Sequence, residues 1–346
     1  MTNQIPTSKR LGFFTRLLDD VPAGERYRLA TEQIVHAETH GYDSAWIAQH
    51  HFHADEGGLP SPTVFLAHVA AKTSSIRLGT GVITLPMENA LRVAEDTAVL
   101  DLLSNGRLEV GFGTGGTRES FEAFGIDPDK KGEVYAEKLA TLYDAWQGKP
   151  LKGENHLYPV VPELLNRVWL ATFSTSGAQL AGRSGHGLML SRTQPRPVGF
   201  PDAKLDDIQN PIIDAYLSSL PQSAAPRILG SRSLFVADDR RRALDLAEIG
   251  LRRVADRFAA AGHKIPGSTI EDLTRALDTH VGTPDDVIAS LKADSALARV
   301  TDITFQVHSV DPPHADILRS IELIAAEVAP ALGWTRSSTP HLIAAQ

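Results

Sequence analysis

The sequence predicts an α/β fold, a single (β/α)₈ TIM barrel with insertions on its C-terminal face. Two observations carry this prediction: short apolar runs alternate with amphipathic helical patterns along the whole chain, and eight such runs are present. Alternating β and α elements favour parallel strands joined by helical crossovers. Eight strands favour a closed barrel over an open sheet, and 346 residues suffice for one barrel with insertions.

The predicted strands are short, and several are apolar on both faces, as in "RVWLA" and "DITFQV". Continuous apolar character is typical of parallel strands that are covered on both sides. The predicted strands are Arg10–Phe14, Ser44–Ala48, Ile76–Thr84, Leu108–Phe112, Val168–Ala171, Leu188–Ser191, Ile228–Val236 and Asp302–Val307.

Helical periodicity and end signals place helices between these strands. The predicted helices are Glu25–His40, Asn89–Ser104, Ala243–Ala260, Pro284–Ala293 and Asp311–Ala331. We expect one domain over residues 1–346, because no linker divides the chain. Two segments, 193–226 and 262–282, interrupt the alternation of strands and helices, and the first holds one helix candidate, Pro211–Leu220. Long segments of this kind usually cover the active face of a barrel, so we expect them to form a lid.

Composition and charge exclude several classes of function. The net charge is −8, whereas binding to a nucleic-acid backbone needs clustered cations. The chain has no cysteine, which excludes thiol nucleophiles, disulfides and thiolate metal sites. No apolar run approaches the ~20 residues of a membrane helix, and no signal peptide is apparent. We therefore expect a cytoplasmic protein with no nucleic-acid or membrane partner.

Three histidines, His50, His51 and His53, follow the second predicted strand in "WIAQHHFHADEGG". In a barrel this position lies on the catalytic face. Adjacent residues of an extended chain point to opposite sides, so His50 and His51 should not share a role. One interpretation is a metal site with His51, His53 and a later ligand such as His308. The other strand ends offer few further ligands, so we expect no metal; loop residues without chemistry remain an alternative.

Two other strand ends suit a flat or anionic ligand. The glycines of "GFGTGG", residues 111–116, allow close approach of a ligand to the backbone, although a tight turn is an equal alternative. Ser174, Thr175, Ser176 and Gly177 follow the fifth predicted strand and open a helix. Free N–H groups and hydroxyls at a helix start suit a phosphate. Ordinary N-capping of the helix remains open.

Together these segments resemble the bacterial luciferase-like monooxygenases, a flavin-dependent family. The resemblance runs from about Leu11 to about Leu332 and rests on ordered segments, among them "GYDSAWIAQHHF", "SIRLGTGVITLP", "AEDTAVLDLLSNGRLEVGFG" and "ATFSTSGAQLAGRSG". It implies a (β/α)₈ barrel that binds FMN in its reduced form, supplied by a separate flavin reductase. It also implies oxidation of a small-molecule substrate with oxygen, and a homodimer.

The resemblance assigns roles to individual residues. His50 matches the family's catalytic histidine, and we expect it to point into the pocket as an acid–base group. Thr80, Gly81 and Val82 match the strand end beneath the flavin ring, with a cis peptide bond expected between Gly81 and Val82. The expected cofactor-binding residues are Thr80, Gly81, Val82, Thr114, Gly115, Ser174, Thr175, Ser176, Gly177 and Ser191.

Two positions depart from the family pattern. Gln49 stands where luciferase has Glu, and Thr114 stands where many relatives have an Arg that pairs with the phosphate. Arg118, Arg183 or Arg192 are candidates to replace that Arg. Two other functions remain: a deazaflavin-dependent oxidoreductase on the same barrel, and a non-catalytic flavin-binding subunit. Retention of His50 and the Ser174 loop argues against the subunit.

Overall fold

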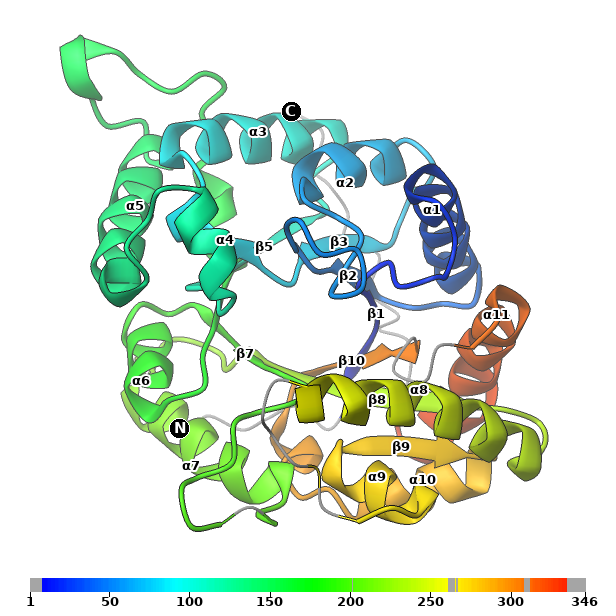
Figure 1. Ribbon diagram of the computed structural model, residues 1–346. Coiled ribbons are helices and arrows are strands. Elements are labelled where there is room, and N and C mark those ends of the chain that lie inside the picture. Colours follow the sequence, from blue (N-terminus) through cyan, green and yellow to red (C-terminus); the bar gives the residue numbers. More distant parts are fainter. Residues whose placement is uncertain (1–7, 201, 261–264, 266, 308–311, 335–346) are drawn as a thin grey trace.

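The structure, a computed structural model, describes residues 8–334 except residues 201, 261–264, 266 and 308–311. Strands form an inner ring and helices surround it (Figure 1). The ring order is β10, β1, β2, β3, β5, β6, β7, β8, and pairing of β10 with β8 closes it. Every pair is parallel. The predicted fold class is therefore confirmed.

All eight predicted strands are present. They are β1 (Arg10–Thr15), β2 (Ser44–Ile47), β3 (Arg77–Thr80), β5 (Leu108–Gly113), β6 (Val168–Ala171), β7 (Gly187–Leu190), β8 (Ile228–Val236) and β10 (Asp302–Gln306). The predicted strand at 76–84 is broken, because β3 ends at Thr80 and a separate strand, β4 (Ile83–Thr84), pairs further along β5.

The five predicted helices are confirmed with small shifts at the ends that the structure describes, whereas α2, α4, α5 and α9 were not predicted. The predicted start of the last helix, Asp311, lies outside the described residues. The helices are α1 (Ala23–Thr39), α2 (Pro62–Ala70), α3 (Ala90–Leu103), α4 (Arg118–Ala123), α5 (Lys131–Trp146), α6 (Thr175–Arg183), α7 (Leu205–Ser219), α8 (Arg240–Ala260), α9 (Ile270–Ala276), α10 (Pro284–Lys292), α11 (His314–Leu323) and α12 (Ala329–Ala331). A π-helical turn, Ile324–Val328, joins the last two. Short 3₁₀ turns lie at Leu85–Met87, Pro128–Lys130, Lys152–Glu154, Pro162–Arg167 and Leu297–Arg299.

The two segments expected to form a lid are partly built into the barrel. Residues 205–219 of the first segment form α7, which packs on α6 so closely that a Cβ at Gly182 would lie 2.6 Å from the Tyr216 carbonyl oxygen. The described part of 262–282 holds α9 and a short strand, β9 (Thr279–Gly282), that pairs in parallel with the last residues of β8. The irregular stretch before α7 is therefore the part of these segments that remains a candidate for a lid.

Two tryptophans fill the middle of the barrel. Trp46 of β2 and Trp169 of β6 meet edge to face, with ring centroids 5.6 Å apart and planes at 86°. Glycines on the neighbouring strands make room for them. A Cβ at Gly79 would lie 2.2 Å from Trp46, and one at Gly187 would lie 2.2 Å from Trp169. The centre is thus packed and cannot serve as a channel.

Charged side chains fill the barrel on the amino-terminal side of the tryptophans. Arg10 pairs with Asp302 at 2.7 Å and Arg77 with Glu109 at 2.5 Å. Glu109 also accepts a hydrogen bond from the Trp169 indole at 2.7 Å. Only a small cavity, about 10 Å³, remains among these residues. A ligand of the barrel must therefore bind at the other end, where the strands finish.

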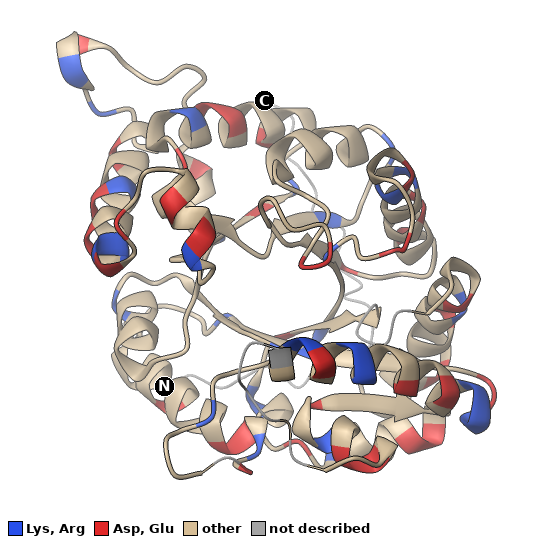
Figure 2. Cartoon of the chain, viewed as in Figure 1, with Lys and Arg blue, Asp and Glu red and all other residues tan. Residues whose placement is uncertain are grey.

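Charges of both signs intermingle on the outer helices (Figure 2). The net charge does not reveal a local cluster of cations. Helix α8 begins with three consecutive arginines, Arg240–Arg242. Each lies within 4.0 Å of a carboxylate, in turn Asp286, Asp245 and Asp316. The cluster is therefore neutralised and is not a bare cationic patch. None of the helices in the described part of the chain combines the length and apolar character needed to cross a membrane.

Candidate active site

The predicted site residues lie at the carboxyl ends of five barrel strands. His50 follows β2, Thr80 ends β3, Thr114 follows β5, Ser174 follows β6 and Ser191 follows β7. Parallel strands finish at the same end of a barrel, so these residues share one face. The other predicted residues accompany them: Gly81, Val82, Gly115, Thr175, Ser176 and Gly177.

An apolar floor closes the barrel beneath this face. Phe14, Val82 and Ala171 are partly buried and pack on the inner cluster that contains both tryptophans. Gly81 lies beside them: a Cβ there would approach the Phe14 ring to 3.0 Å, and its N–H donates to the Ile47 carbonyl at 2.7 Å. The Gly81–Val82 peptide bond is cis, as expected. The floor presents apolar side chains and a Cβ-free backbone to whatever lies above it.

The Thr80 hydroxyl is engaged in hydrogen bonds within the fold and does not face solvent. It is fully buried, donates to the Gly111 carbonyl at 3.0 Å and accepts from the Gly111 N–H at 2.8 Å. These two bonds join β3 to β5 just beyond Gly79, where the backbone pairing stops. We expected Thr80 to contact a cofactor; its side chain instead holds the strand ends that support the floor.

The loop after β6 presents a cluster of hydroxyls at the start of α6. Ser174 is the N-cap, and its Oγ accepts from the Gly177 N–H at 3.2 Å. The hydroxyls of Thr172 and Ser176 lie 3.2 and 3.1 Å from the same Oγ. The first N–H groups of a helix have no partner within it, and the helix dipole favours an anion there. This loop is therefore suited to a phosphate.

A lysine that was not predicted from the sequence lies close to the end of β5. Lys131 donates to the Gly115 carbonyl at 3.1 Å and lies 5.6 Å from the Phe121 ring centre. Arg118 is exposed and paired within α4. Arg183 lies in the last turn of α6, at the opposite end from the Ser174 loop. Neither arginine is placed to substitute for the one that Thr114 replaces.

His50 lies in a positively charged and largely buried environment. The Arg16 guanidinium is 3.5 Å from its Nε2, and its Nδ1 is buried without a hydrogen-bond partner. A Cβ at Gly57 would lie 2.4 Å from that Nδ1. Burial first, and then the charges of Arg16 and Arg192, lower the pKa of His50 to about 3. The imidazole is therefore neutral at pH 7, which corrects the expectation that it titrates near neutrality.

His51 and His53 have surroundings different from those of His50. The His51 ring meets Phe124 of α4 edge-on, with centroids 4.8 Å apart and planes at 71°, and burial lowers its pKa. Phe52 lies beside both rings. His53 is exposed in the following loop. The structure therefore gives the adjacent histidines separate neighbours.

Within the residues that the structure describes, the histidines after β2 do not gather with other metal ligands. Among the residues that the structure describes, the group with ligand atoms close enough for a metal ion is His36, His40 and Glu322, on α1 and α11. That group lies outside the barrel mouth. His308, the further ligand considered for a metal site, lies outside the described residues.

Gln49 joins three segments around the mouth. Its amide donates to the Glu88 carboxylate at 2.6 Å and to the Pro60 carbonyl at 3.1 Å. Its carbonyl oxygen accepts from the Thr84 N–H at 2.7 Å. An amide can both donate and accept, whereas an ionised carboxylate only accepts. Gln49 can therefore donate to the Glu88 carboxylate that it faces, which an ionised Glu at this position could not do.

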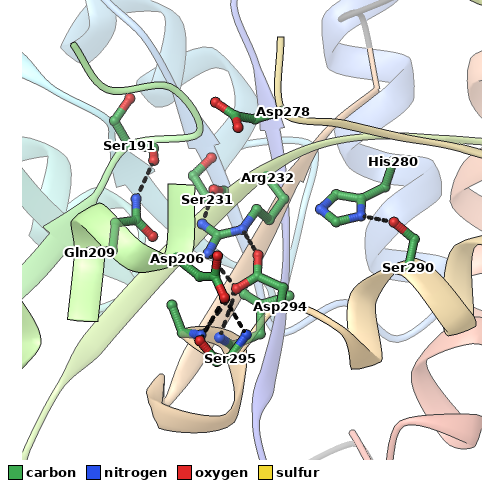
Figure 3. A network of polar contacts seen from close by, with 12 residues as sticks. Ser191, Asp206, Gln209, Ser231, Arg232, Asp278, His280, Ser290, Asp294 and Ser295 are labelled. Carbon is green, nitrogen blue, oxygen red and sulfur yellow. Dashed lines mark hydrogen bonds and ion pairs between the residues drawn. The ribbon is translucent and has the colours of Figure 1, made fainter. Parts of the chain in front are cut away.

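Arg192 follows Ser191 and reaches across to β8, where it donates to the Ser233 hydroxyl at 3.1 Å. The turn that carries it is held by Gln209, which donates to the Ser191 carbonyl at 2.7 Å (Figure 3). Burial and the charge of Arg16 lower the pKa of Arg192 to about 9. Because Arg16 and Arg192 lie far apart in the sequence, no local pattern announces them as a pair.

The chain is similar in sequence to proteins of one family. A family described as luciferase-like monooxygenase matches residues 11–301. The 4-hydroxyprotoasukamycin monooxygenase of Streptomyces nodosus subsp. asukaensis is 28% identical over 84% of this chain and 82% of its own. The oxygenase component of the flavin-dependent trigonelline monooxygenase of Acinetobacter baylyi is 25% identical over 58% and 57%. The first curated relatives, each 32% identical, match over about half of their own length, 49% and 57%.

Two solved structures show the same fold. The oxygenating constituent of 3,6-diketocamphane monooxygenase from Pseudomonas putida, in complex with FMN, has a TM-score of 0.74 at 19% identity and covers 93% of this chain and 98% of its own. The coenzyme F420-dependent tetrahydromethanopterin reductase of Methanopyrus kandleri has a TM-score of 0.66 at 18% identity, over 94% and 99%.

Proposed function

Because this chain belongs to the luciferase-like monooxygenase family, we propose that it is the oxygenase of a two-component system, which uses reduced FMN and oxygen to oxidise a small organic substrate. One observation supports a flavin-type cofactor. A hydroxyl-lined helix start and an apolar floor occupy the same face of the barrel, as a phosphate-bearing planar ring requires.

The residues present fit FMN. The N–H groups and hydroxyls of the Ser174–Gly177 loop would hold its phosphate. Phe14, Val82 and Ala171 would lie under the ring, where Gly81 leaves room for close approach. Lys131 supplies positive charge near the end of β5, in place of the arginine that Thr114 replaces.

The chain's own residues would prepare the site for oxidation. Bound reduced flavin supplies the electrons for oxygen activation. The floor and the packed tryptophans exclude water from below. His50, neutral and beside Arg16, can accept a proton at one ring nitrogen and donate from the other. Thr80 keeps β3 and β5 in register beneath the ring.

The second candidate is a deazaflavin-dependent oxidoreductase, favoured by the shared fold of the F420-dependent reductase. That cofactor also carries a phosphate and a planar ring, so the site discriminates weakly between the two. A non-catalytic flavin-binding subunit is less well supported, because His50 and the Ser174 loop are both kept. A separate reductase is supported by the relative named as an oxygenase component. A homodimer is part of the proposal by family resemblance only.

Titration and turnover separate these candidates. Tight FMN binding, together with oxygen consumption that needs a flavin reductase, NADH and a substrate, supports the proposal. Preferential binding of coenzyme F420 and oxygen-independent hydride transfer would replace it with the second candidate. Flavin binding without turnover, over a broad panel of aldehydes, ketones and acids, would favour the non-catalytic subunit.

A further inference from the structure

Positive charge is concentrated beside His50, on the side of the mouth formed by β1, β7 and β8. Arg16 follows β1, and Arg192 follows β7. In the strand register Ser233 pairs with Gln306, which in turn pairs with Phe14. The Ser233 hydroxyl that binds Arg192 therefore lies at the level of the apolar floor. The guanidinium of Arg192 is inserted into the mouth rather than spread over the surface.

The charge of Arg192 is not neutralised as that of its neighbour is. Arg196, four residues further on, has a bidentate pair with Asp278 at 2.7 and 2.8 Å. Within the described part of the chain, Arg192 makes no ion pair with a carboxylate: its side chain donates to Ser233, and the charge of Asp278, which pairs with Arg196, acts on it only from a longer distance. A guanidinium carries five N–H donors in a fork that matches a carboxylate. Arg192 is half-buried, and a guanidinium with unused donors in such a place suits an anionic partner.

Polar atoms without partners line the same side of the barrel. The Ser231 hydroxyl on β8 and the Thr304 hydroxyl on β10, opposite each other in the register, are also unbonded, but they lie one inward-facing layer before Ser233 and Gln306 and therefore below the apolar floor. The whole amide of Gln194, two residues beyond Arg192, is also buried and unbonded. The Nδ1 of His50 is likewise buried without a hydrogen-bond partner. Buried polar atoms are nearly always satisfied, so several orphans together indicate an absent polar occupant.

We propose that Arg192 and Arg16, together with the His50 imidazole, bind the carboxylate of an anionic organic substrate. The inference rests on the proposed function, because it places this acid beside the cofactor of the same site. A carboxylate there would accept charge-assisted hydrogen bonds from Arg192 and place its organic part over the apolar floor. Substrate selection would then favour small organic acids over neutral aldehydes and ketones.

The direction of Arg192 argues against a role in holding the flavin phosphate. Its contact is with Ser233 on β8, and its charge acts on Arg16 and His50, which follow β1 and β2. The Ser174 loop follows β6, on the opposite side of β7 from β8. Arg192 therefore turns away from the loop suited to phosphate. Two anionic groups would occupy two separate places.

The test measures anion binding to the cofactor-free protein, with the His50 ring resonances in NMR as the local readout. Acetate and benzoate are the probes, and acetamide and benzamide are the uncharged controls. We expect a saturable shift of the His50 resonances with the acids and none with the amides. Arg192→Gln should weaken acid binding on the order of 10- to 100-fold, and Arg192→Lys should restore part of it. Arg257→Gln is the matched control, because the charge of Arg257 also acts on His50 but Arg257 is paired with Asp55 and Glu56; its loss should shift the His50 resonances without weakening acid binding.

Three outcomes would overturn the inference: no response of His50 to either acid, equal binding of acids and amides, or an unchanged affinity in Arg192→Gln. The wild-type probe titration decides the matter even where a variant fails to fold. A parallel FMN titration keeps the two proposals apart. FMN binding without acid binding removes the anion site alone, whereas acid binding without flavin binding removes the proposed cofactor and leaves the anion site. Loss of FMN binding in Arg192→Gln with acid binding intact would reassign Arg192 to the phosphate.

Discussion

The guanidinium of Arg16 lies 3.5 Å from the Nε2 of His50, and the two face each other across the ends of neighbouring strands β1 and β2. Both groups bear N–H donors, and a protonated His50 would put a second positive charge against the first. The neutral imidazole avoids this conflict because one of its nitrogens is an acceptor. The protonation state of His50 is thus set by Arg16, Arg192 and burial, and a bound anion would change it.

The first prediction concerns the pH dependence of His50. Its pKa in the fold, about 3, lies below the ordinary value, so the unfolded chain binds the proton more readily. The stability from the neutral form is present above the ordinary pKa of about 6.5 and is lost as pH falls towards the folded value. NMR titration should show no protonation of His50 above about pH 5. Arg192→Gln should raise its pKa. A wild-type transition near neutrality would contradict the argument.

The second prediction concerns turnover in the proposed oxygenase reaction. His50→Ala should leave FMN affinity nearly unchanged, because the phosphate loop and the floor lie on other strands. It should lower kcat on the order of 10²-fold or more, the scale of a lost acid–base group. His51→Ala is the control. It removes a ring that packs on Phe124, so it should lower thermal stability with little effect on kcat. Equal losses of kcat in both variants would remove the special role of His50.

Much of the fold could be predicted from the sequence because strand burial and helix periodicity are local properties. The apolar runs located all eight strands, and the parallel arrangement then placed His50 and Ser174 on one face. The same reasoning passed over α5, although Tyr135, Leu139 and Leu142 have helical spacing and are buried. An unpredicted helix between two correct strands leaves the topology unchanged.

The contacts that define the site could not be predicted because they depend on distant residues. Lys131 reaches the end of β5 from the start of α5, and Arg192 reaches Ser233 on the next strand. The hydroxyl of Thr80 forms hydrogen bonds with the backbone of Gly111, and no sequence motif reveals this contact. Charge and hydrogen-bond accounting therefore needs the folded chain, whereas the position of a strand end does not.

The third prediction tests the packing around the tryptophans. Gly79→Ala should destabilise the fold by about 1–3 kcal/mol, because its Cβ would overlap Trp46 in a filled barrel. Gly187→Ala should behave similarly against Trp169. Gly132→Ala, in α5, is the matched control: a Cβ there meets nothing within 4 Å and should raise stability by about 0.4–1 kcal/mol. Chemical denaturation measures all three, and a neutral Gly79→Ala would refute the packing argument.

The fourth prediction tests the phosphate role of the loop before α6. Ser174→Ala removes the N-cap and a hydroxyl, so it should cost about 1 kcal/mol of stability and weaken FMN binding. Riboflavin, which lacks the phosphate, should bind wild type and variant alike. Thr283→Ala is the matched control, because the Thr283 hydroxyl likewise accepts from the N–H three residues on, within a capping box at the start of α10 and away from the site. It should lose stability and keep its FMN affinity. Equal weakening of FMN and riboflavin by Ser174→Ala would move the phosphate elsewhere.

The last prediction concerns Gln49, the position that departs from luciferase. The Gln49 amide donates to the Glu88 carboxylate at 2.6 Å, so Gln49→Glu sets two carboxyl groups against each other in a buried place. Both cannot ionise there, and the pair must retain a proton or repel. We expect a loss of about 1–3 kcal/mol at pH 8, from the missing hydrogen bond and the like charge.

The pH dependence and a double substitution make this prediction specific. A carboxyl group whose pKa is raised in the fold binds its proton more tightly there than in the unfolded chain, so the deficit of Gln49→Glu should shrink as pH falls towards 5. Q49E/E88Q exchanges the two groups and restores a donor opposite an acceptor. It should recover most of the lost stability, although the Pro60 carbonyl would lose the amide group that donates to it. Thermal denaturation at pH 5 and pH 8 measures each variant. A deficit that is independent of pH and persists in the double variant would show that the contact between Gln49 and Glu88 does not govern this position.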